Sequence, residues 1–238
     1  LFLARAVVKT IGQLGGMSSE STGQYYRLIN EETKRIRGGL HSAPISKVSV
    51  DNHDIERLQR ADNSDAPEQV LARHAREVES AGADLLVICT NTMHRVADDV
   101  AAAIAIPLLH IADATALAIK AENVETVGLL GTRFTMEQEF YKGCLEKHGL
   151  DVVVPPAEDR EIVHRVIYEE LCLGNVRDDS RSEFLRIIDQ LNARGARAVI
   201  EGCTEIGMLV EQRHTAVPLF DTTAIHARHA VRAALRGT

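Results

Sequence analysis

The sequence contains no tryptophan, and aromatic residues make up only 4% of it. It also lacks a surplus of basic residues, because 27 lysines and arginines stand against 34 acidic residues and give a net charge of −7. Proteins that bind nucleic acids usually carry a basic surface and stacking aromatic side chains, so this composition argues against a nucleic-acid partner. No apolar run approaches the roughly 20 residues that cross a bilayer. The start of the chain also lacks the charged end and cleavage site of a signal peptide, so we expect no membrane partner.

Cysteine is scarce as well. The chain has four cysteines among 238 residues, and they form neither a C-x-x-C pair nor a pattern with zinc-ligand spacing. We therefore predict neither a disulfide scaffold nor a metal site, and a cytoplasmic protein with reduced thiols is the simplest interpretation. The length permits one large domain or two of ordinary size, and 45% hydrophobic residues suffice for the full core of an α/β protein.

A short module that ends in Cys-Thr occurs twice in the chain. In each copy a Gly-Ala pair is followed by an apolar run and then by Cys89-Thr90 or Cys203-Thr204. Repetition of several blocks in the same order and at nearly the same separation indicates an internal duplication. The other repeated blocks contain Gly12 and Gly128, and Pro107 and Pro218.

Apolar, β-branched runs alternate with segments of helical periodicity, which predicts parallel sheets flanked by helices. We predict an α/β fold with two pseudo-symmetric lobes, each with a mostly parallel sheet, and an active site in the cleft between them. We expect the lobes to span 1–110 and 111–222, with a last helix at about 223–238 that packs back on the first lobe. The predicted strands span 7–14, 45–50, 85–89, 108–110, 126–130, 152–154, 198–202 and 219–220. The predicted helices span 20–37, 66–81, 91–104, 112–121, 135–148, 159–173, 178–194, 205–211 and 223–235.

Both Cys-Thr pairs follow a predicted strand, at the sheet edge where α/β proteins bind ligands. Each pair also precedes a predicted helix, whose N-terminus is expected to lower the pKa of a thiol and to bind carboxylates. A cysteine in this place can instead be a small buried hydrophobe. Two cysteines at matched repeat positions favour a catalytic role for Cys89 and Cys203. Cys144 and Cys172 have no counterparts and lie within predicted helices, where packing is the better interpretation.

Several polar residues near these positions are candidates for substrate binding. The glycine-rich turn that ends in Met17 and Ser18 lacks the spacing of a dinucleotide loop and the lysine of a P-loop. Its amides suit a small anion better, although a tight turn explains the glycines equally well. Asp51 ends a predicted strand, where a lone acid is often only a cap, and His164 lies in a helix that borders the predicted cleft. The remaining candidates are Thr90, Asn91, Thr92, Thr132, Thr204 and Glu205.

At these residues the chain resembles the aspartate/glutamate racemase superfamily, and most of all its cofactor-independent aspartate and broad-specificity amino-acid racemases. The two cysteine motifs together are specific, whereas one alone is not. The resemblance implies an active site at the interface of two lobes, an amino-acid substrate, no cofactor and a homodimer. The motifs that carry it are Gly15-Gly16-Met17-Ser18, Cys89-Thr90-Asn91-Thr92-Met93-His94, Ile111-Ala112-Asp113-Ala114-Thr115, Leu130-Gly131-Thr132, Tyr168-Glu169-Glu170-Leu171 and Gly202-Cys203-Thr204-Glu205-Ile206.

The resemblance also implies a reaction in which one thiolate removes the α-proton and the other thiol returns a proton to the opposite face. Glutamate racemases typically carry histidine after the second Cys-Thr, so Glu205 favours the aspartate or broad-specificity branch. Ser19 and Glu201 depart from the usual pattern and leave the substrate range open. A hydantoin racemase, an enzyme like maleate isomerase or arylmalonate decarboxylase, and a non-catalytic amino-acid-binding protein remain alternatives.

Overall fold

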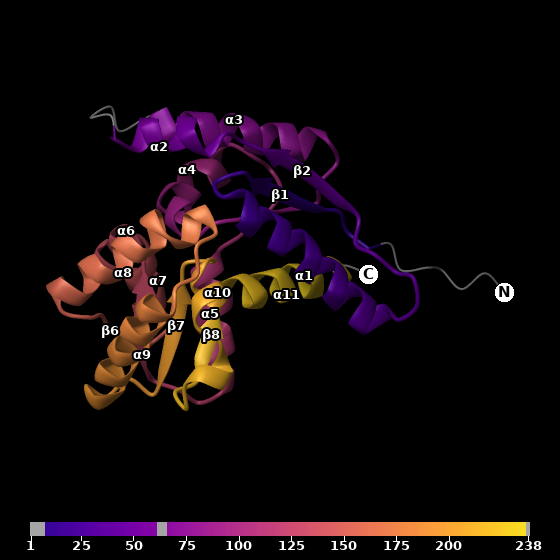
Figure 1. The fold of residues 1–238 in the computed structure, drawn as a ribbon. Helices are drawn as coiled ribbons and strands as arrows, with labels where there is room; N and C mark the ends of the chain where they lie inside the picture. The colour runs from indigo at the N-terminus through magenta and orange to yellow at the C-terminus, as the bar shows by residue number, and fades with distance from the viewer. Residues whose placement is uncertain (1–7, 61–65, 237–238) are drawn as a thin grey trace. The chain divides into compact units, whose positions relative to one another are not determined.

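The computed structural model describes residues 8–60 and 66–236 and confirms the predicted α/β class. Its strands are β1 (Ile11–Gly15), β2 (Ile45–Ser49), β3 (Leu85–Ile88), β4 (Leu108–Leu109), β5 (Thr126–Gly131), β6 (Asp151–Val153), β7 (Ala198–Gly202) and β8 (Leu219–Asp221). Within the described residues they form two four-stranded parallel sheets, in the orders β2-β1-β3-β4 and β6-β5-β7-β8 (Figure 1). The first four strands and the last four thus follow the same order, as a duplicated chain predicts.

The helices of the described residues fall largely where the periodicity predicts them. The α-helices are α1 (Ser19–Arg37), α2 (Asn52–Arg60), α3 (Ala66–Ser80), α4 (Ala97–Ala102), α5 (Ile111–Ala121), α6 (Arg133–Glu137), α7 (Glu139–Lys147), α8 (Ala157–Glu169), α9 (Asp178–Ala193), α10 (Ile206–Leu209) and α11 (Thr222–Arg236). Short 3-10 helices are η1 (Thr92–Val96), η2 (Leu171–Leu173) and η3 (Gln212–His214). None of the helices in the described ranges is both long and apolar enough to cross a membrane.

The chain divides into two compact units, each with one sheet. Unit 1 contains the described residues up to Cys89, then Val96–His110, and the described residues from His226 onward. Unit 2 contains Thr90–Arg95 and Ile111–Ile225. The short segment Thr90–Arg95, which follows the first cysteine, therefore clusters with the second sheet. Residues 1–7 and 61–65 of the expected first lobe, and residues 237–238 of the expected last helix, lie outside the described residues.

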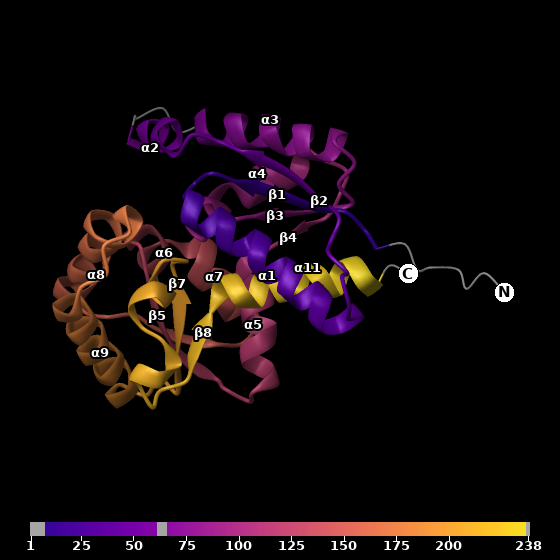
Figure 2. The ribbon, with the colours of Figure 1, turned by 45° about the vertical axis from the view of Figure 1, so that its right-hand side comes forward.

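In unit 1, α3 covers one face of the sheet, and α1 and α11 cover the other (Figure 2). Side chains of β1, β3, α1 and α11 form one apolar cluster, which includes Ile11, Tyr25, Val87 and Val231. His226 on α11 bridges this layer: its Nδ1 lies 2.8 Å from the hydroxyl of Tyr25, and its Nε2 lies 2.9 Å from the carbonyl oxygen of Leu109. From His226 onward, the last helix thus belongs to the unit that holds the first strand.

In unit 2, the sheet is likewise covered on both faces (Figure 2). Val127 and Leu129 of β5 pack in one apolar cluster with α5 and α7, including the buried Tyr141. Leu130 belongs to a second cluster with α8 and α9, including Phe184. The alternation of neighbouring β5 residues between the two clusters is the period of two that a strand imposes.

Several predicted helices are broken or shortened. The predicted helix 135–148 divides at Gln138, whose backbone is extended, and 159–173 divides at Glu170. The predicted helix 91–104 is instead η1 followed by α4, and 205–211 contains only the four-residue α10. Apolar periodicity runs through each break, so a sequence pattern does not detect a single non-helical residue.

Two further differences have local causes. The structure contains α2, which the sequence analysis misses because this helix is almost entirely polar and buries little beyond Ile55. Strand β1 begins at Ile11, whereas the predicted strand began at residue 7, which lies outside the described residues; Val8 to Thr10 are not in a strand. In both cases, contacts with the rest of the unit determine whether the segment forms a helix or a strand. The residue pattern of the segment alone does not.

Candidate active site

The two Cys-Thr pairs follow corresponding strands of the two sheets, β3 and β7. Strand β3 pairs with β1 up to Ile88, and Cys89 is the next residue. Strand β7 pairs with β5 up to Gly202, and Cys203 is the next residue. Both cysteines therefore lie at the carboxyl end of an inner strand of a parallel sheet, which is where such sheets position ligand-binding residues.

The two cysteines differ by one residue in their position relative to the strand pairing. Gly12 pairs with Leu86 and Gly128 pairs with Val199, so the register makes Cys89 the counterpart of Gly202 rather than of Cys203. The cause is one additional residue between the glycine and the cysteine in the second copy of the module.

The Cys89 side chain is fully buried in the apolar cluster of unit 1. Its backbone is held on both sides: the amide N–H of Cys89 donates to the carbonyl of Leu14 at 2.9 Å, and the Ser21 hydroxyl donates to the carbonyl of Cys89 at 2.8 Å. Burial raises the pKa of the Cys89 thiol far above its usual range, and the positive charge of Lys47 offsets this only in part.

Cys203 lies in the α8/α9 cluster of unit 2 and is 9% exposed. Its Sγ donates to Oε2 of Glu205 at 2.9 Å, and the Thr204 hydroxyl donates to the same oxygen at 2.6 Å. Burial raises the pKa of the Cys203 thiol well above its usual value, and the negative charge of Glu205 raises it further. Glu205 thus stabilises the protonated form of this thiol.

These thiol pKa values run opposite to the effect expected from the helices after each cysteine. The helix after Cys89 is the short η1, which begins only at Thr92, and α10 after Cys203 has four residues. Such short helices align too few peptide dipoles to stabilise a thiolate strongly, whereas burial disfavours the charged form of each thiol. Desolvation therefore outweighs the helix N-terminus at both positions.

The hydroxyl and amide candidates of unit 2 form two connected groups. The hydroxyls of Thr92 and Thr132 lie 3.2 Å apart, and Thr132 also caps α6 by accepting from the backbone N–H of Thr135 at 3.4 Å. Nδ2 of Asn91 donates to the Thr222 hydroxyl at 3.0 Å, which in turn donates to the carbonyl of Glu201 at 2.8 Å. These bonds connect the segment after Cys89 to the carboxyl ends of β5 and β7.

His94 of the first cysteine motif and the candidate residue His164 both have structural partners. His94 is buried, its Nδ1 lies 2.8 Å from the carbonyl oxygen of Thr90, and its Nε2 accepts from the N–H of Ile111 at 3.2 Å. Nδ1 of His164 accepts from the N–H of Arg133 at 3.2 Å. Burial and the charge of Arg133 lower the pKa of His164, so this ring is neutral near pH 7.

The candidates of unit 1 include two cap residues. The Ser18 hydroxyl accepts from the N–H of Ser21 at 3.1 Å and caps α1, directly after the buried Met17. The exposed Asp51 accepts from the N–H of His53 at 2.9 Å at the start of α2. The candidate residues thus fall into two sets, with Met17, Ser18, Asp51 and Cys89 in unit 1 and the others in unit 2.

Sequence reasoning missed Gln13 and Thr223, which belong with Asn91 and Glu201 to a set of buried side chains whose polar atoms lack hydrogen-bond partners. Both side-chain atoms of Gln13, Oδ1 of Asn91, Oε1 of Glu201 and Oγ1 of Thr223 are in this state. An unpaired buried polar atom is costly, and groups that bind polar ligands are a common place for it. The signal in the sequence was the polar Gln13 within an otherwise apolar strand. In the structure Gln13 pairs with Val87, just before the end of β3.

Glu201 lies beside Asp221, its register partner on β8. The Glu201 side chain is only 5% exposed. Burial, and secondarily the negative charge of Asp221, raise the pKa of Glu201 to about 8. The unusual acid two residues before Cys203 is therefore largely protonated at neutral pH and adds little charge near the thiol.

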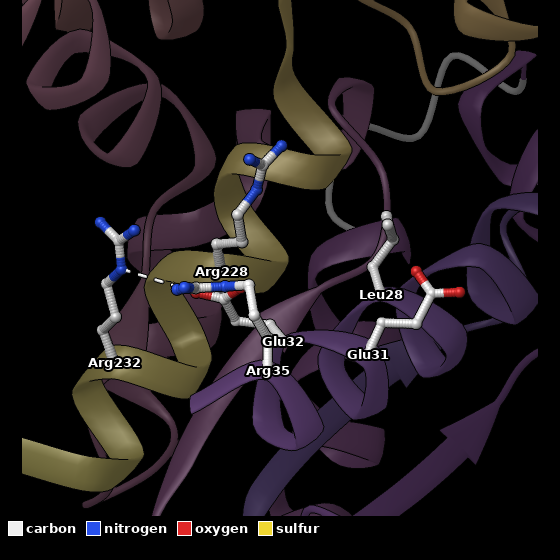
Figure 3. Close-up of a pocket in the computed structure, with 6 residues that line it drawn as sticks. All are labelled: Leu28, Glu31, Glu32, Arg35, Arg228 and Arg232. Atoms are coloured by element: carbon white, nitrogen blue, oxygen red, sulfur yellow. Dashed lines mark hydrogen bonds and ion pairs between the residues drawn. The ribbon is translucent and has the colours of Figure 1, made fainter. Parts of the chain in front are cut away.

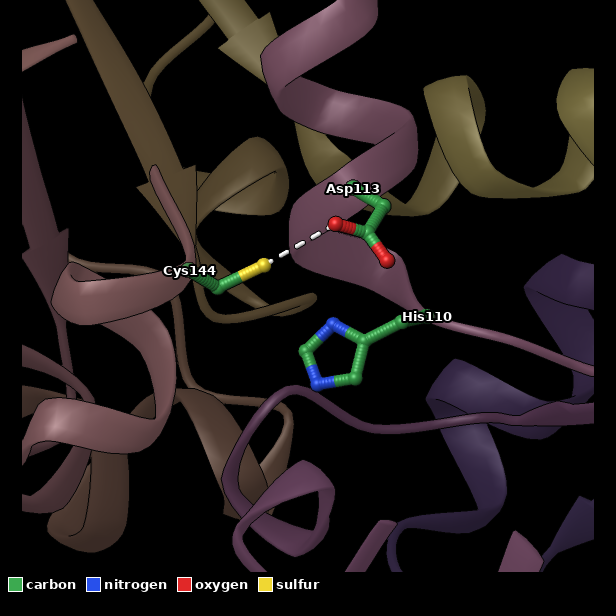
Figure 4. A group of neighbouring side chains, drawn as sticks. All are labelled: His110, Asp113 and Cys144. Carbon is green, nitrogen blue, oxygen red and sulfur yellow. Dashed lines mark hydrogen bonds between the residues drawn. The ribbon is translucent and has the colours of Figure 1, made fainter. Parts of the chain in front are cut away.

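Cys144 lies in a different environment, on α7. Its thiol points to Asp113 of α5 and donates to Oδ1 at 3.1 Å, as Figure 4 shows. Nε2 of His148 lies 2.7 Å from the same oxygen. Partial burial and Asp113 raise the pKa of Cys144 to about 12, so this thiol is an unreactive structural group.

Residues 14–230 match the family described as Asp/Glu/hydantoin racemase, with both cysteine motifs inside the matched range. The chain belongs to this family. The match confirms the resemblance drawn from the motifs, and membership identifies the protein as an isomerase of the racemase type.

Relatives of this racemase cover nearly all of its length. A candidate Asp/Glu racemase from Yersinia pestis is 54% identical, with a TM-score of 0.90 over 95% of this chain and 99% of the other. An aspartate racemase homologue from Pyrococcus horikoshii is 34% identical, with a TM-score of 0.82 and the same coverages, 95% and 99%. The broad specificity amino-acid racemase RacX from Bacillus subtilis is 20% identical over 93% of this chain and 96% of its own length.

Proposed function

We propose that this racemase interconverts the L and D forms of aspartate, glutamate or a broader set of amino acids without a cofactor, and that Cys89 and Cys203 transfer the protons. The observation that carries the proposal is the position of both cysteines, each directly after an inner strand of one of two sheets with the same strand order. The names of the related proteins, which include an aspartate racemase homologue and a broad specificity amino-acid racemase, support the substrate class.

The proposed reaction conserves protons and charge. One cysteine, as a thiolate, takes the proton from the α-carbon, and the electron pair of the C–H bond moves into the adjacent carboxylate. The other cysteine, as a thiol, then donates a proton to the opposite face of the same carbon. One thiol and one thiolate are present before and after, with their roles exchanged, so the reverse reaction uses the same groups.

Burial keeps both thiols protonated in the unliganded protein, so one must lose its proton when substrate binds. The α-ammonium group of an amino acid supplies a positive charge next to the sulfur, which favours the thiolate. Glu205 is suited to receive the proton of Cys203, because the thiol already donates to Oε2 at 2.9 Å. The free thiols thus avoid oxidation between turnovers, since the thiolate is the reactive form.

The substrate carboxylate gains charge as the α-proton leaves, and hydrogen-bond donors must stabilise it. Thr90, Asn91, Thr92 and Thr204 are the proposed donors on the segments that follow β3 and β7. The unpaired Oδ1 of Asn91 adds an acceptor for the ammonium group. Met17, Ser18, Asp51, Thr132 and His164 complete the proposed binding residues.

Proton exchange in deuterium oxide tests the proposal. L-aspartate, L-glutamate, other L-amino acids and a 5-substituted hydantoin are incubated with the protein, and loss of the α-proton signal is followed by NMR. We expect exchange with acidic amino acids, and a loss of at least about a hundredfold in Cys89→Ala and Cys203→Ala, because each removes one proton-transfer group. Cys144→Ala is the control and retains the wild-type rate.

The single serine variants sharpen this test. Cys89→Ser and Cys203→Ser should each lose exchange mainly with one enantiomer, because each thiol is assigned to one face of the α-carbon. A double alanine variant with full activity would contradict the two-cysteine mechanism. Exchange of the hydantoin alone would assign the protein to the hydantoin branch of the family instead.

We also propose that the protein is a homodimer in a reducing, cytoplasmic environment. Its four cysteines are all free thiols, as expected where disulfides do not form. The dimer follows from the resemblance of the motifs to the racemases.

A further inference from the structure

Three side chains of unit 2 converge on one carboxylate oxygen outside the candidate active site. The thiol of Cys144 donates to Oδ1 of Asp113 at 3.1 Å, and Nε2 of His148 lies 2.7 Å from the same oxygen. Asp113 lies on α5, Cys144 lies on α7, and His148 directly follows α7. None of the three has a role in the proposed proton transfer, so that reaction does not explain the cluster.

The packing of α5 and α7 holds this cluster together. Cys144 and His148 are four residues apart, so they lie on the same face of one helical turn. Side chains of both helices share one apolar cluster, and Cys144 packs against it. Nζ of Lys120 on α5 also donates to the carbonyl oxygen of His148 at 2.8 Å and ties the end of α7 to α5. Asp113 stands 31 residues before Cys144, which is why the sequence shows no zinc-ligand spacing.

A second imidazole lies beside Asp113. One ligand atom from each of His110, Asp113 and Cys144 lies within 4.8 Å of the other two, and Figure 4 shows these side chains pointing toward one another. His110 directly precedes Ile111, the first residue of α5, so the covalent chain keeps it close to Asp113. The cluster thus combines one thiol, one carboxylate and two imidazoles.

Thiolates, imidazoles and carboxylates are the ligands of zinc in proteins, usually four of them in a tetrahedral arrangement. Sulfur and nitrogen ligands disfavour Mg²⁺ and Ca²⁺, which prefer oxygen. The side chains of Asp113 and His148 are 51% and 29% exposed, so an ion can reach them from solvent. The cluster therefore has both the ligand types and the access that a zinc site requires.

We propose that Cys144, Asp113, His148 and His110 bind one zinc ion. The S–H bond of Cys144 breaks, its proton goes to solvent, and an electron pair of the sulfur forms the bond to zinc. Both histidines bind as neutral rings through a nitrogen lone pair, and Asp113 binds as a carboxylate. One thiolate and one carboxylate balance the two positive charges of the ion.

Two lysines oppose a cation at this place. Lys120 reaches the carbonyl oxygen of His148, and the charge of Lys147 acts on Cys144. Both lysines are exposed, so solvent screens their charges, whereas zinc–ligand bonds of about 2.0–2.3 Å act directly. Burial and Asp113 raise the pKa of Cys144 to about 12, and Lys147 offsets this only in part. Zinc must therefore displace the thiol proton and should bind more tightly as pH rises.

The charged side chains that Figure 3 shows between α1 and α11 do not form a comparable site. Arg35 donates to both oxygens of Glu32, at 2.7 Å and 2.8 Å, and Nε of Arg232 lies 3.8 Å from Oε1 of Glu32. A carboxylate held by guanidinium groups in this way is not available to a metal ion.

Titration with cobalt(II) tests the proposal with a spectroscopic readout. Co²⁺ occupies tetrahedral zinc sites, and a thiolate ligand gives a sulfur-to-cobalt charge-transfer band in the near ultraviolet. The reduced protein is freed of metal with a chelator and titrated with cobalt chloride. We expect saturation at about one ion per chain, with this band and the intense visible bands of tetrahedral Co²⁺. Added Zn²⁺ should remove both.

The variants identify the ligands. Cys144→Ser should abolish the charge-transfer band and weaken Zn²⁺ binding at least about tenfold, because a serine hydroxyl keeps its proton. His148→Gln should weaken Zn²⁺ binding by a similar factor. Cys172→Ser is the matched control, because it replaces the other half-buried cysteine and should keep the band. Cys89→Ala and Cys203→Ala should keep it as well.

Thermal unfolding gives a second readout. Zn²⁺ should raise the Tm of the wild type and of Cys172→Ser but not that of Cys144→Ser, and the Tm values without metal show whether the variants fold. Absence of saturable binding, a band that persists in Cys144→Ser, or unchanged affinity in His148→Gln would overturn the proposal. Loss of the band in Cys203→Ala would also overturn it, because the ion would then bind at a proposed catalytic thiol.

Discussion

Cys89 and Cys203 hold their protons because both sulfurs are buried, and this sets the first requirement of the proposed reaction. The pKa of each thiol and of Glu201 is raised, with burial as the largest cause in every case. A buried acid that stays neutral is available as a proton donor. The reaction also needs one thiolate. This thiolate must then be stabilised by the charge of the bound substrate or by a change in solvent access to the sulfur.

Glu201 gives a prediction at the residue scale. Its carboxyl group has a pKa of about 8 in the folded protein, against 4.5 for the unperturbed group. The folded protein therefore holds this proton more tightly than the unfolded chain does. The resulting contribution to the free energy of unfolding is fully present below about pH 4.5 and is lost as pH rises to about 8. We expect Glu201→Gln to remove this loss and to stabilise the protein above pH 8, relative to the wild type, by on the order of a few kcal/mol.

Urea unfolding at several pH values between 4 and 9 measures this effect. The difference between Glu201→Gln and the wild type should grow with pH across that window. Glu122→Gln, at an exposed position of the same unit, is the control and should leave the pH dependence unchanged. A difference that does not change with pH would show that Glu201 ionises normally in the folded protein.

At the scale of the elements, the turn between β1 and α1 is tightly constrained at Gly16. Gly16 has a φ of +93°, and a Cβ atom there would lie 2.0 Å from the carbonyl oxygen of Val50. The N–H of Gly16 also donates to the Thr22 hydroxyl at 2.8 Å. A side chain at this position therefore requires both an unfavourable backbone conformation and a movement of the chain after β2.

We expect Gly16→Ala to lower the free energy of unfolding by about 2–4 kcal/mol, from the sum of backbone strain and steric overlap. Gly195→Ala is a matched comparison, because Gly195 has a φ of +103° but open space around its Cβ position. That variant should lose only the conformational part, about 1 kcal/mol. Chemical denaturation of both variants measures the two values, and equal losses would mean that the overlap at Gly16 is relieved at no cost.

Most elements are predictable from the chain because their signals are local. Strand β7 is an apolar run that follows a left-handed glycine at Gly195, and α9 ends just before that glycine. The helix α2 was not predicted, because Ile55 and Leu58 are its only apolar residues and two positions are too few to indicate helical periodicity. The four-residue α10 and the break at Gln138 depend on packing around them in the same way.

At the scale of the whole molecule, the duplication is visible in the chain and in the sheets. The same strand order occurs twice, and the register of the inner pairs places Gly12 and Gly128 at equivalent positions. Each of these glycines faces helix or strand side chains too closely for a Cβ atom, Val78 in one unit and Leu191 in the other. The repeated glycine is thus explained by close packing of a helix on the sheet in both units.

The proposed homodimer is a prediction at this scale. One chain has a mass of 26.1 kDa, so light scattering after size-exclusion chromatography should give twice this value. Exposed apolar side chains such as Leu173 (69%) and Leu117 (51%) are available for association. A mass of one chain at all concentrations up to those of the activity assay would rule out the dimer.

The sequence by itself determined the fold class, the duplication, the position of each cysteine at a strand end and the family. These features arise from short-range patterns: alternation of apolar residues, glycines at helix ends, and motifs of a few residues. Only the tertiary structure decided the raised thiol pKa values, the position of the buried Glu201 beside the half-buried Asp221, and the contact between Glu32 and Arg232. The physical reason is that desolvation and charge act through space, so they bring together residues as distant in the chain as Glu32 and Arg232.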